Sequence, residues 1–391
     1  MRKIISLFLA LLVMPMLLFS QNDTLPQPDR MAEDFVTVSL CVADPTDWHQ
    51  DVLGVSGHAF LRMQCPYYGL DYCFSYEGEN VNDNLYRYLS GKTKMGYFGF
   101  KTDDYLEDYK KWNRSVHEYI LDLPPEAETR LWEILDNNMI SGRSLRQDLT
   151  RYGCAITVVK FIKKALGRDY VINYTEDEYL VTHTRREIAY RSLEQYPWLR
   201  LVILLFTDSR YDKDCPLDEK LIIPVDLAAV WQQATVDGRA MATYRGELVS
   251  GAEQDGSKKM FTPMLCAIII LLLTIAFSFT RWSNYWDYLL LSIEVLLGLA
   301  LIVCWIIIGD LDISAYILLV LFNPLPLIFW KWRRHWAVYY AGIVILGVAV
   351  LACLPHMIVD PAILVLALSY VVMYGKDSVR DMFSKLKVRK R

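Results

Sequence analysis

Residues 152–159 of the chain read YGCAITVV. The cysteine of this stretch, Cys154, stands where a polar turn gives way to a run of helical apolar periodicity that reaches Leu166 and ends at Gly167, a residue common just past helix C-termini. Backbone amides at the start of a helix are unpaired and favour negative charge, so they should lower the pKa of a thiol placed there. The amides of Cys154 and Ala155 are also suited to bind the oxyanion of a tetrahedral intermediate. The stretch therefore predicts a helix that begins at a reactive cysteine.

A second stretch, residues 56–62 (SGHAFLR), supplies the partner for this thiol. His58 follows a glycine and opens an alternating apolar and polar run, which predicts a strand. A cysteine at a helix tip and a histidine on a strand are typical of a thiol nucleophile with its base. The alternative is a structural role for both, because a cysteine on a helix is often a small buried hydrophobe. Three cysteines inside long apolar runs take that role directly: Cys266, Cys304 and Cys353.

The residue that orients the imidazole is expected on the next strand, residues 71–76, which forms a hairpin with the His58 strand. We take Glu77 as the candidate, with Ser75 and Asp71 as the other possibilities and an ordinary solvated glutamate as the alternative for Glu77. Three further histidines are alternative bases, although none follows a glycine at the start of a strand: His49, His117 and His183.

Composition separates the chain into a folded half and an apolar half. Of its 391 residues, 53% are hydrophobic, and the mean hydropathy of +0.18 is high for a soluble protein. The net charge of −4 argues against nucleic acid as a partner. The charged start, short apolar run and polar exit of residues 1–20 predict a signal peptide or an uncleaved N-terminal anchor. Residues 22–258 are then an exported domain.

Five apolar runs follow, and each is near the length that a helix needs to cross a bilayer. They cover residues 261–280, 286–308, 313–330, 337–355 and 361–375. Lys and Arg mark alternate loops and crowd the tail, residues 376–391. By the positive-inside rule, this pattern places the exported domain outside and the C-terminus in the cytoplasm. The sequence therefore predicts a five-helix transmembrane domain over residues 261–375.

The exported half contains an odd number of cysteines. Five cysteines lie there: Cys41, Cys65, Cys73, Cys154 and Cys215. An odd number in an oxidising compartment leaves at least one thiol unpaired. Cys65 and Cys73 flank the hairpin turn and are candidates for a disulfide. We find no paired-cysteine metal spacing and no glycine-rich phosphate loop, so neither a metal nor a cofactor is expected.

Two further segments are open to more than one interpretation. Thr175 is a candidate cap for a helix that holds His183. Residues 197–206, PWLRLVILLF, are too short to span a bilayer and predict either a helix at the membrane surface or a buried core helix.

Taken together, these motifs resemble a known family. Residues 57–62 (GHAFLR), 152–155 (YGCA) and 197–200 (PWLR), with the five-span C-terminal half, are similar to the Lnb family of bacterial lipoprotein N-acyltransferases. The resemblance covers nearly the whole mature chain. It implies an α+β fold, a permuted papain-like thiol-enzyme domain of the clan that includes lecithin:retinol acyltransferase, followed by an α-helical membrane bundle. Many relatives carry Asn before the cysteine, whereas this chain has Gly153, which leaves backbone amides as the oxyanion donors.

The resemblance also implies a reaction and a location. An acyl chain would pass from a membrane phospholipid to Cys154, with His58 as base, and then to the N-terminal amine of a diacylated lipoprotein. The protein would be a multi-pass protein of the bacterial inner membrane with a periplasmic catalytic domain. Two alternatives from other classes remain: a thiol hydrolase of lipid or cell-wall peptide, and a non-catalytic membrane sensor in which Cys154 is a core residue.

Overall fold

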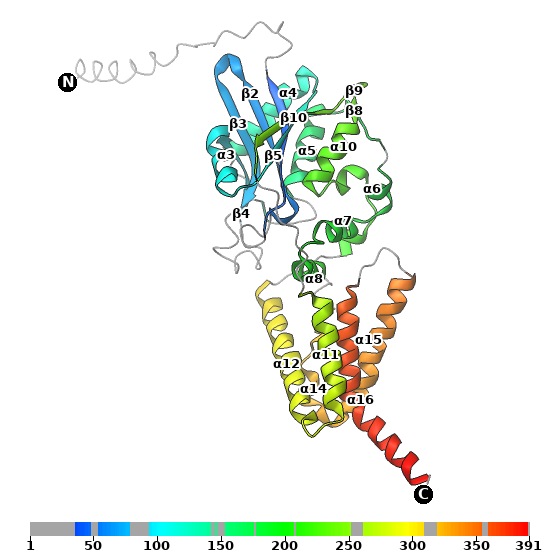
Figure 1. Ribbon diagram of the computed structural model, residues 1–391. Coiled ribbons are helices and arrows are strands. Elements are labelled where there is room, and N and C mark those ends of the chain that lie inside the picture. Colours follow the sequence, from blue (N-terminus) through cyan, green and yellow to red (C-terminus); the bar gives the residue numbers. More distant parts are fainter. Residues whose placement is uncertain are drawn as a thin grey trace, which may run out of the picture.

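The computed structural model describes residues 36–47, 54–78, 94–141, 145–146, 153–175, 177–206, 209–251, 261–308, 319–353 and 359–389. It has an α+β domain built on an antiparallel sheet, followed by a helical C-terminal region (Figure 1). The predicted signal segment, residues 1–20, and His49 lie outside the described residues.

A seven-stranded sheet forms the centre of the first domain, with the order β10-β5-β1-β2-β3-β4-β6 among the described residues. A second, three-stranded sheet has the order β7-β8-β9. The strands of the main sheet are β1 (Thr37–Ala43), β2 (His58–Cys65), β3 (Leu70–Gly78), β4 (Lys94–Lys101), β5 (Val116–Leu121), β6 (Leu145–Arg146) and β10 (Ala242–Val249). Those of the small sheet are β7 (Ile172–Asn173), β8 (Thr235–Val236) and β9 (Arg239–Ala240).

The expected hairpin is confirmed and fixes which face each residue of β2 occupies. β2 pairs with β3 from Cys65↔Leu70 to Leu61↔Phe74 and with β1 from Gln64↔Thr37 to His58↔Ala43. Because side chains alternate across a strand, Ala59 and Leu61 lie on one face of the sheet, and Phe60 lies on the other. The turn between β2 and β3 is a short 3-10 helix, η2 (Pro66–Tyr68), that ends at Gly69 with a positive φ.

Helices cover both faces of this sheet. One face packs against α4 (Pro125–Ile140), α5 (Cys154–Leu166) and α10 (Pro224–Gln233), whose fully buried side chains include Leu131, Ile162 and Trp231. The other face packs against α3 (Thr102–Lys111) through Tyr105, Leu106 and Tyr109. The predicted helix from Cys154 to Leu166 with its cap at Gly167 is confirmed.

Shorter helices follow α5 and lead toward the C-terminal region. They are α6 (Glu178–Thr182), α7 (Arg185–Ser192), α8 (Pro197–Phe206), η3 (Ser209–Asp212) and α9 (Leu217–Lys220). The expectation that Thr175 caps a helix is wrong, because Asp177 accepts the N–H of Leu180 at the start of α6. The Thr175 hydroxyl instead donates to the carbonyl of Gln233, and His183 lies at the end of α6.

The disulfide considered between Cys65 and Cys73 is absent, and both are free, buried thiols. Strand alternation explains this. Cys65 falls on the same face of β2 as Leu61 and Met63, whereas Cys73 packs with Phe60 on the opposite face. Cys41, Cys154 and Cys215 are free thiols as well.

The C-terminal region is a bundle of apolar helices. It comprises α11 (Pro263–Ser278), α12 (Ser283–Ile308), α14 (Leu325–Ile328), η4 (Trp330–Trp332), α15 (Arg333–Cys353) and α16 (Pro361–Arg389). In the described residues, two helical stretches are long and apolar enough to cross a membrane, Ser283–Val303 and Trp330–Cys353, and Pro263–Ser278 is apolar but shorter. The third expected span, 313–330, is not one described helix: 309–318 lie outside the described residues, and the helix breaks after Leu321.

Helix α8 joins the two parts of the molecule (Figure 1). On the domain side, Leu199 packs with Val55 of the short 3-10 helix η1 (Gly54–Ser56). On the bundle side, Leu201 packs against the bundle core, and the Trp198 indole donates to the Phe261 carbonyl at 2.9 Å. Of the two possibilities for residues 197–206, the described part of α8 thus fits a helix at the boundary with the apolar region.

The turn that precedes His58 depends on a glycine. Gly57 has φ +93°, and a Cβ there would lie 3.0 Å from the Ala43 carbonyl oxygen. We expect Gly57→Ala to lower the free energy of unfolding by about 1–2 kcal/mol, because an L-residue is strained in this region of φ. Gly153→Ala is the matched control, since its φ is −105° and its Cβ would meet no described atom within 4 Å. Equal thermal unfolding temperatures for the two variants would contradict this account.

Candidate functional site

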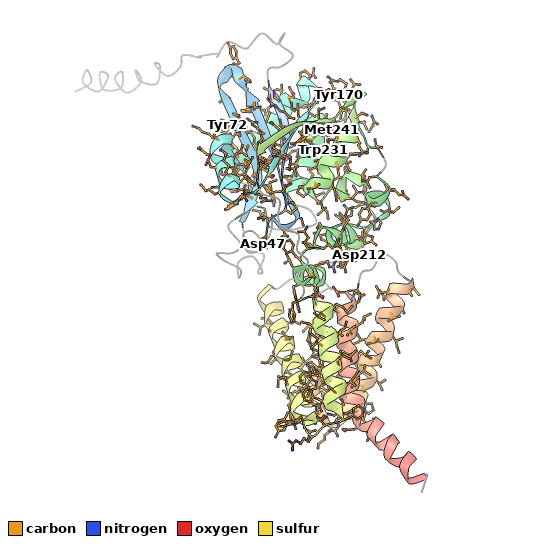
Figure 2. All side chains as sticks on the ribbon, in the orientation of Figure 1. Asp47, Tyr72, Tyr170, Asp212, Trp231 and Met241 are labelled. Atoms are coloured by element: carbon orange, nitrogen blue, oxygen red, sulfur yellow. The ribbon has the colours of Figure 1, made fainter. Side chains whose placement is uncertain are left out.

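Cys154 begins α5 at the end of the sheet domain that faces the bundle. Figure 2 places Asp47, which follows β1, at this same end. The Cys154 thiol is half-buried and faces three backbone N–H groups, those of Ala59, Ala155 and Cys154 itself. The N–H of Ala59 is available because the pairing of β2 with β3 stops at Leu61↔Phe74. The thiol therefore lies against β2 at the residue next to His58.

The sequence predicted a lowered pKa for the Cys154 thiol, and this prediction is wrong. Burial raises the pKa of Cys154 above the ordinary thiol value. The three N–H groups and the Arg114 guanidinium act in the opposite direction, as expected at a helix N-terminus, but burial outweighs them. The resting form at neutral pH is therefore the thiol and not the thiolate.

His58 occupies the opposite face of β2 from Ala59. Its ring stacks near Phe60, with centroids 6.2 Å apart, and its Nε2 lies 2.8 Å from the hydroxyl oxygen of Ser75 on β3. In the described part of the chain, no hydrogen bond joins the His58 ring to Cys154, and Ser75 is the hydrogen-bond partner of the ring. Because Nε2 is engaged by Ser75, Nδ1 is the nitrogen that remains for a thiol.

Of the three candidates for orienting the imidazole, the structure places Ser75 against it. Continuing the β2–β3 register would set His58 opposite Glu77, but the strands no longer pair there. Glu77 instead accepts a hydrogen bond from the Tyr105 hydroxyl on α3. The carboxylate of Asp71 instead accepts hydrogen bonds from Arg62, Gln64 and Thr102.

Tyr105 connects Glu77 to the histidine through Ser75. The Ser75 hydroxyl faces the Tyr105 phenol and lowers its pKa, which burial otherwise raises. Since Tyr105 donates its proton to Glu77, its oxygen is left to accept from Ser75, whose oxygen can then accept from Nε2 of His58. This direction of donation favours the tautomer with the proton on Nε2 and a lone pair on Nδ1.

Arg114 is the buried cation of the site, and the sequence contained no signal for it. Its side chain is 3% exposed, donates to the carbonyls of Asp44 and Gly54, and lies over the ring of Tyr109 at 5.5 Å. Burial first and Arg114 second lower the pKa of His58 to about 3. The imidazole is thus neutral throughout the physiological pH range, and its resting form carries a lone pair on one ring nitrogen.

The other histidines considered as bases have separate surroundings. His117 on β5 lies 3.2 Å from the Asp44 carboxylate, and His183 bonds to the carbonyl of Tyr179 and the hydroxyl of Thr182. In the part of the chain that the structure describes, no hydrogen bond joins either of them to Cys154. Among the described residues, no group of three or more His, Cys, Asp or Glu side chains gathers in a way that would hold a metal ion.

The raised thiol pKa leads to a measurable pH dependence. The rate of Cys154 alkylation by iodoacetamide, followed by peptide mass mapping from about pH 6 to about pH 10, should stay low at neutral pH. It should still be rising above the ordinary thiol pKa of about 8.5. In Arg114→Met, loss of the cation should raise the thiol pKa further and move the curve to higher pH. A plateau of fast alkylation already at neutral pH would mean a resting thiolate and would contradict this assignment.

Comparison with known proteins adds no relative from which a role could be transferred. No family model, curated protein or solved structure matches the chain. The similarity to the Lnb family, carried by residues 57–62, 152–155 and 197–200, therefore stays a prediction from the sequence, and the chemistry below rests on the geometry of Cys154, His58 and Ser75.

Proposed function

We propose that the protein is a cysteine-dependent acyltransferase that takes an acyl chain from a membrane phospholipid and transfers it, through a thioester on Cys154, to the N-terminal amine of a diacylated lipoprotein. The observation that carries this proposal is the placement of the Cys154 thiol. The thiol lies at a helix N-terminus and faces three backbone N–H groups, one of which belongs to Ala59, the residue that follows His58.

In the first half of the reaction, Nδ1 of His58 removes the Cys154 proton as the sulfur attacks the ester carbonyl of the lipid. The N–H groups of Cys154 and Ala155 are the donors for the oxyanion that forms. When the carbon–oxygen bond breaks, the imidazolium returns the proton to the departing glycerol oxygen. The products are a lysophospholipid and an acyl thioester on Cys154.

In the second half, the neutral amine of the acceptor attacks the thioester carbonyl. His58 takes a proton from the nitrogen and gives it to the Cys154 sulfur as the carbon–sulfur bond breaks. The enzyme regains its thiol, and the acceptor carries an amide. The thiol and the imidazole are both neutral at rest, so in each half of the proposed reaction His58 acts as a general base while the new bond forms, and not as part of a preformed ion pair.

Membrane lipid as the donor is supported by the surface of the bundle. Large apolar side chains on α12 and α15 are exposed, among them Leu296 (67%), Val338 (72%) and Ile345 (70%). An apolar surface of this kind is stable in lipid and unfavourable in water. Five spans, an exported domain and a cytoplasmic C-terminus are part of the proposal, as is the lipoprotein acceptor, which rests on the resemblance to the Lnb family.

The central test is the intact mass of the purified protein after incubation with phospholipid vesicles and no acceptor. We expect a fatty-acyl increment that hydroxylamine removes and that is absent in Cys154→Ser. Adding a diacylated lipopeptide should remove the increment and yield an N-acylated peptide. Free fatty acid without acylated amine would favour the hydrolase, whereas full function of Cys154→Ser would favour the sensor.

The base has its own expected effect. His58→Ala should lower the rate of acyl-enzyme formation by about 10²–10⁴-fold, the range usual for a positioned general base. The same variant should retain the thermal unfolding temperature of the wild type to within a few degrees, since His58 is at the start of its strand. An unchanged rate in a folded His58→Ala protein would remove His58 from the mechanism.

The series of hydrogen bonds from Glu77 through Tyr105 and Ser75 to His58 gives a prediction for Tyr105. Tyr105→Phe should lower the acylation rate roughly tenfold, because the loss of one hydrogen bond of about 1 kcal/mol frees Ser75 to donate to the imidazole. Tyr109→Phe is the matched control, since the Tyr109 hydroxyl bonds to Tyr105 at 3.2 Å and not to Ser75. The Tyr105 positioning role fails if both variants lose the same activity.

A further inference from the structure

The third apolar segment of the bundle is interrupted near its middle. Residues 319–321 are helical, the chain then leaves the helix, and α14 resumes at Leu325. Pro324 has no N–H to offer the carbonyl four residues earlier, that of Val320. The N–H of Leu325 bonds to the Asn323 side chain at 3.2 Å and so is not available to the Leu321 carbonyl. The break therefore leaves the Val320 and Leu321 carbonyls, among others, without helical donors in apolar surroundings, where each needs a donor.

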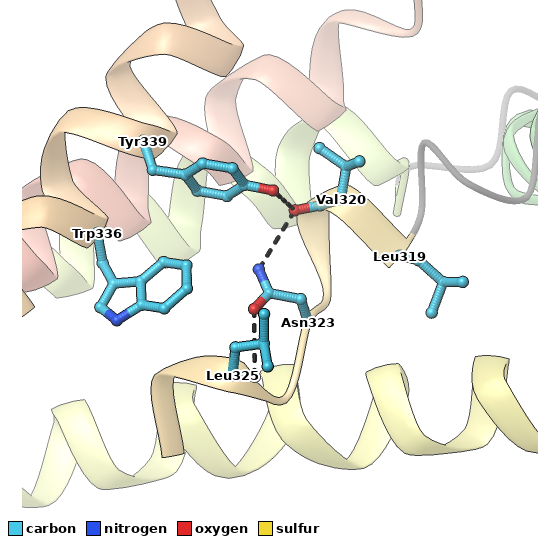
Figure 3. A pocket seen from close by; sticks show the side chains of 6 residues that line it. All are labelled: Leu319, Val320, Asn323, Leu325, Trp336 and Tyr339. Carbon is cyan, nitrogen blue, oxygen red and sulfur yellow. Dashed lines mark hydrogen bonds between the residues drawn. The ribbon is translucent and has the colours of Figure 1, made fainter. Parts of the chain in front are cut away.

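Neighbouring tyrosines of α15 supply those donors. The Tyr339 hydroxyl donates to Val320 O at 2.8 Å, and Figure 3 shows this bond beside that of Asn323 to the same carbonyl. Tyr339 and Asn323 also line a mainly apolar cavity of about 370 Å³ beside the break. The Tyr340 hydroxyl lies 2.8 Å from Leu321 O. Both of these carbonyls thus face a phenol.

Tyr340 has a second oxygen neighbour, the carboxyl group of Glu294 on α12. Glu294 is 0% exposed, and its Oε1 contacts the Tyr340 hydroxyl while its Oε2 lies 2.6 Å from the hydroxyl of Tyr374 on α16. These oxygens form a line of three close contacts: Tyr374 to Glu294, Glu294 to Tyr340, and Tyr340 to Leu321.

Each contact between two oxygens needs one proton between them, so the line needs three. The two phenols supply two, and the Leu321 carbonyl supplies none. We infer that Glu294 binds the third proton: its carboxyl group is neutral and donates to Tyr340, which donates to Leu321 O, while Tyr374 donates to the other carboxyl oxygen. A proton-binding site is thereby assigned to the core of the bundle.

The charges around Glu294 agree with a neutral group. In the described residues, no cation pairs with it. Lys376 donates to Asp287 and Ser283, and Arg333 pairs with Asp377. Two further titratable groups lie against the cluster: the rings of Tyr370 and Tyr339 contact that of Tyr340, with centroids 4.9 Å and 5.2 Å away. An ionised carboxylate buried without a cation would be strongly unfavourable.

The bound proton has a structural role. The hydrogen bonds of the neutral Glu294 side chain connect α12 to α15 and α16, and Tyr340 extends the connection to the broken segment. The neutral carboxyl group donates one of these hydrogen bonds, which an ionised glutamate cannot do. This assignment does not depend on the proposed acyltransferase activity.

Infrared spectroscopy of the full-length protein in lipid nanodiscs at neutral pH tests the assignment. In the spectrum of wild type minus Glu294→Gln, we expect loss of the C=O stretch of an un-ionised carboxyl group. The matched control is Glu107→Gln, because Glu107 on α3 is exposed and its pKa is lowered by Lys110. Its difference spectrum should show loss of carboxylate bands only. Carboxylate loss in the Glu294→Gln spectrum as well would overturn the proposal.

Thermal unfolding of the same proteins provides an independent readout. Glu294→Gln should keep the wild-type unfolding temperature to within a few degrees, because its amide N–H can donate to Tyr340 while its C=O accepts from Tyr374. Glu294→Met, which can do neither, should unfold at a clearly lower temperature, and it also serves to assign the infrared band if the Gln variant does not fold. Equal unfolding temperatures for the Gln and Met variants would overturn the donor role.

Discussion

The separation of β2 from β3 beyond Leu61↔Phe74 is the constraint on which the site depends. If the two strands had stayed paired, the Ala59 N–H would have bonded within the sheet and would not have been available to the Cys154 thiol. Instead, α5 presents its first residue to an open stretch of β2, and the thiol meets the N–H groups of its own helix and of the strand. The same separation shifts His58 away from Glu77 and toward Ser75.

Much of the domain could be predicted from the sequence because the signals are local. The β2–β3 hairpin and the helix Cys154–Leu166 follow from alternation, helical periodicity and a terminal glycine. Thr175 misled because it and Asp177 are both good caps, and only the tertiary position of Gln233 decides between them.

The site could be predicted in part, and its missing members are non-local. Arg114 lies 40 residues before Cys154 in the chain and reaches the site only because β1, β2 and β5 are neighbours. Whether Ser75 or Glu77 bonds to His58 depends on where the pairing of β2 with β3 stops. No residue type in the sequence marks that position. The direction of the thiol pKa shift depended on how deeply the helix tip is buried, and burial is a property of the assembled fold.

Tyrosine hydroxyls solve a similar problem in both parts of the molecule. Tyr105 joins a carboxylate to the surroundings of a half-buried histidine, and Tyr340 joins a carboxyl group to a carbonyl freed by a helix break. In each place the phenol carries one proton and one accepting oxygen, so it transmits the direction of donation along a line of groups. Such lines set which neighbour bears a proton.

The contact between α8 and the turn before His58 has a consequence for substrate choice. Val55 packs with Leu199 of α8, Leu201 of α8 packs into the bundle, and Ser56 bonds to Ser192 of the neighbouring α7 at 3.0 Å. The end of the domain that carries Cys154 is therefore held at a fixed position relative to the apolar region. Under the proposed function, this fixed position selects acyl donors by depth. Acyl groups whose carbonyl lies at the level of the Cys154 sulfur can react, whereas those deeper in the membrane or dissolved in water cannot.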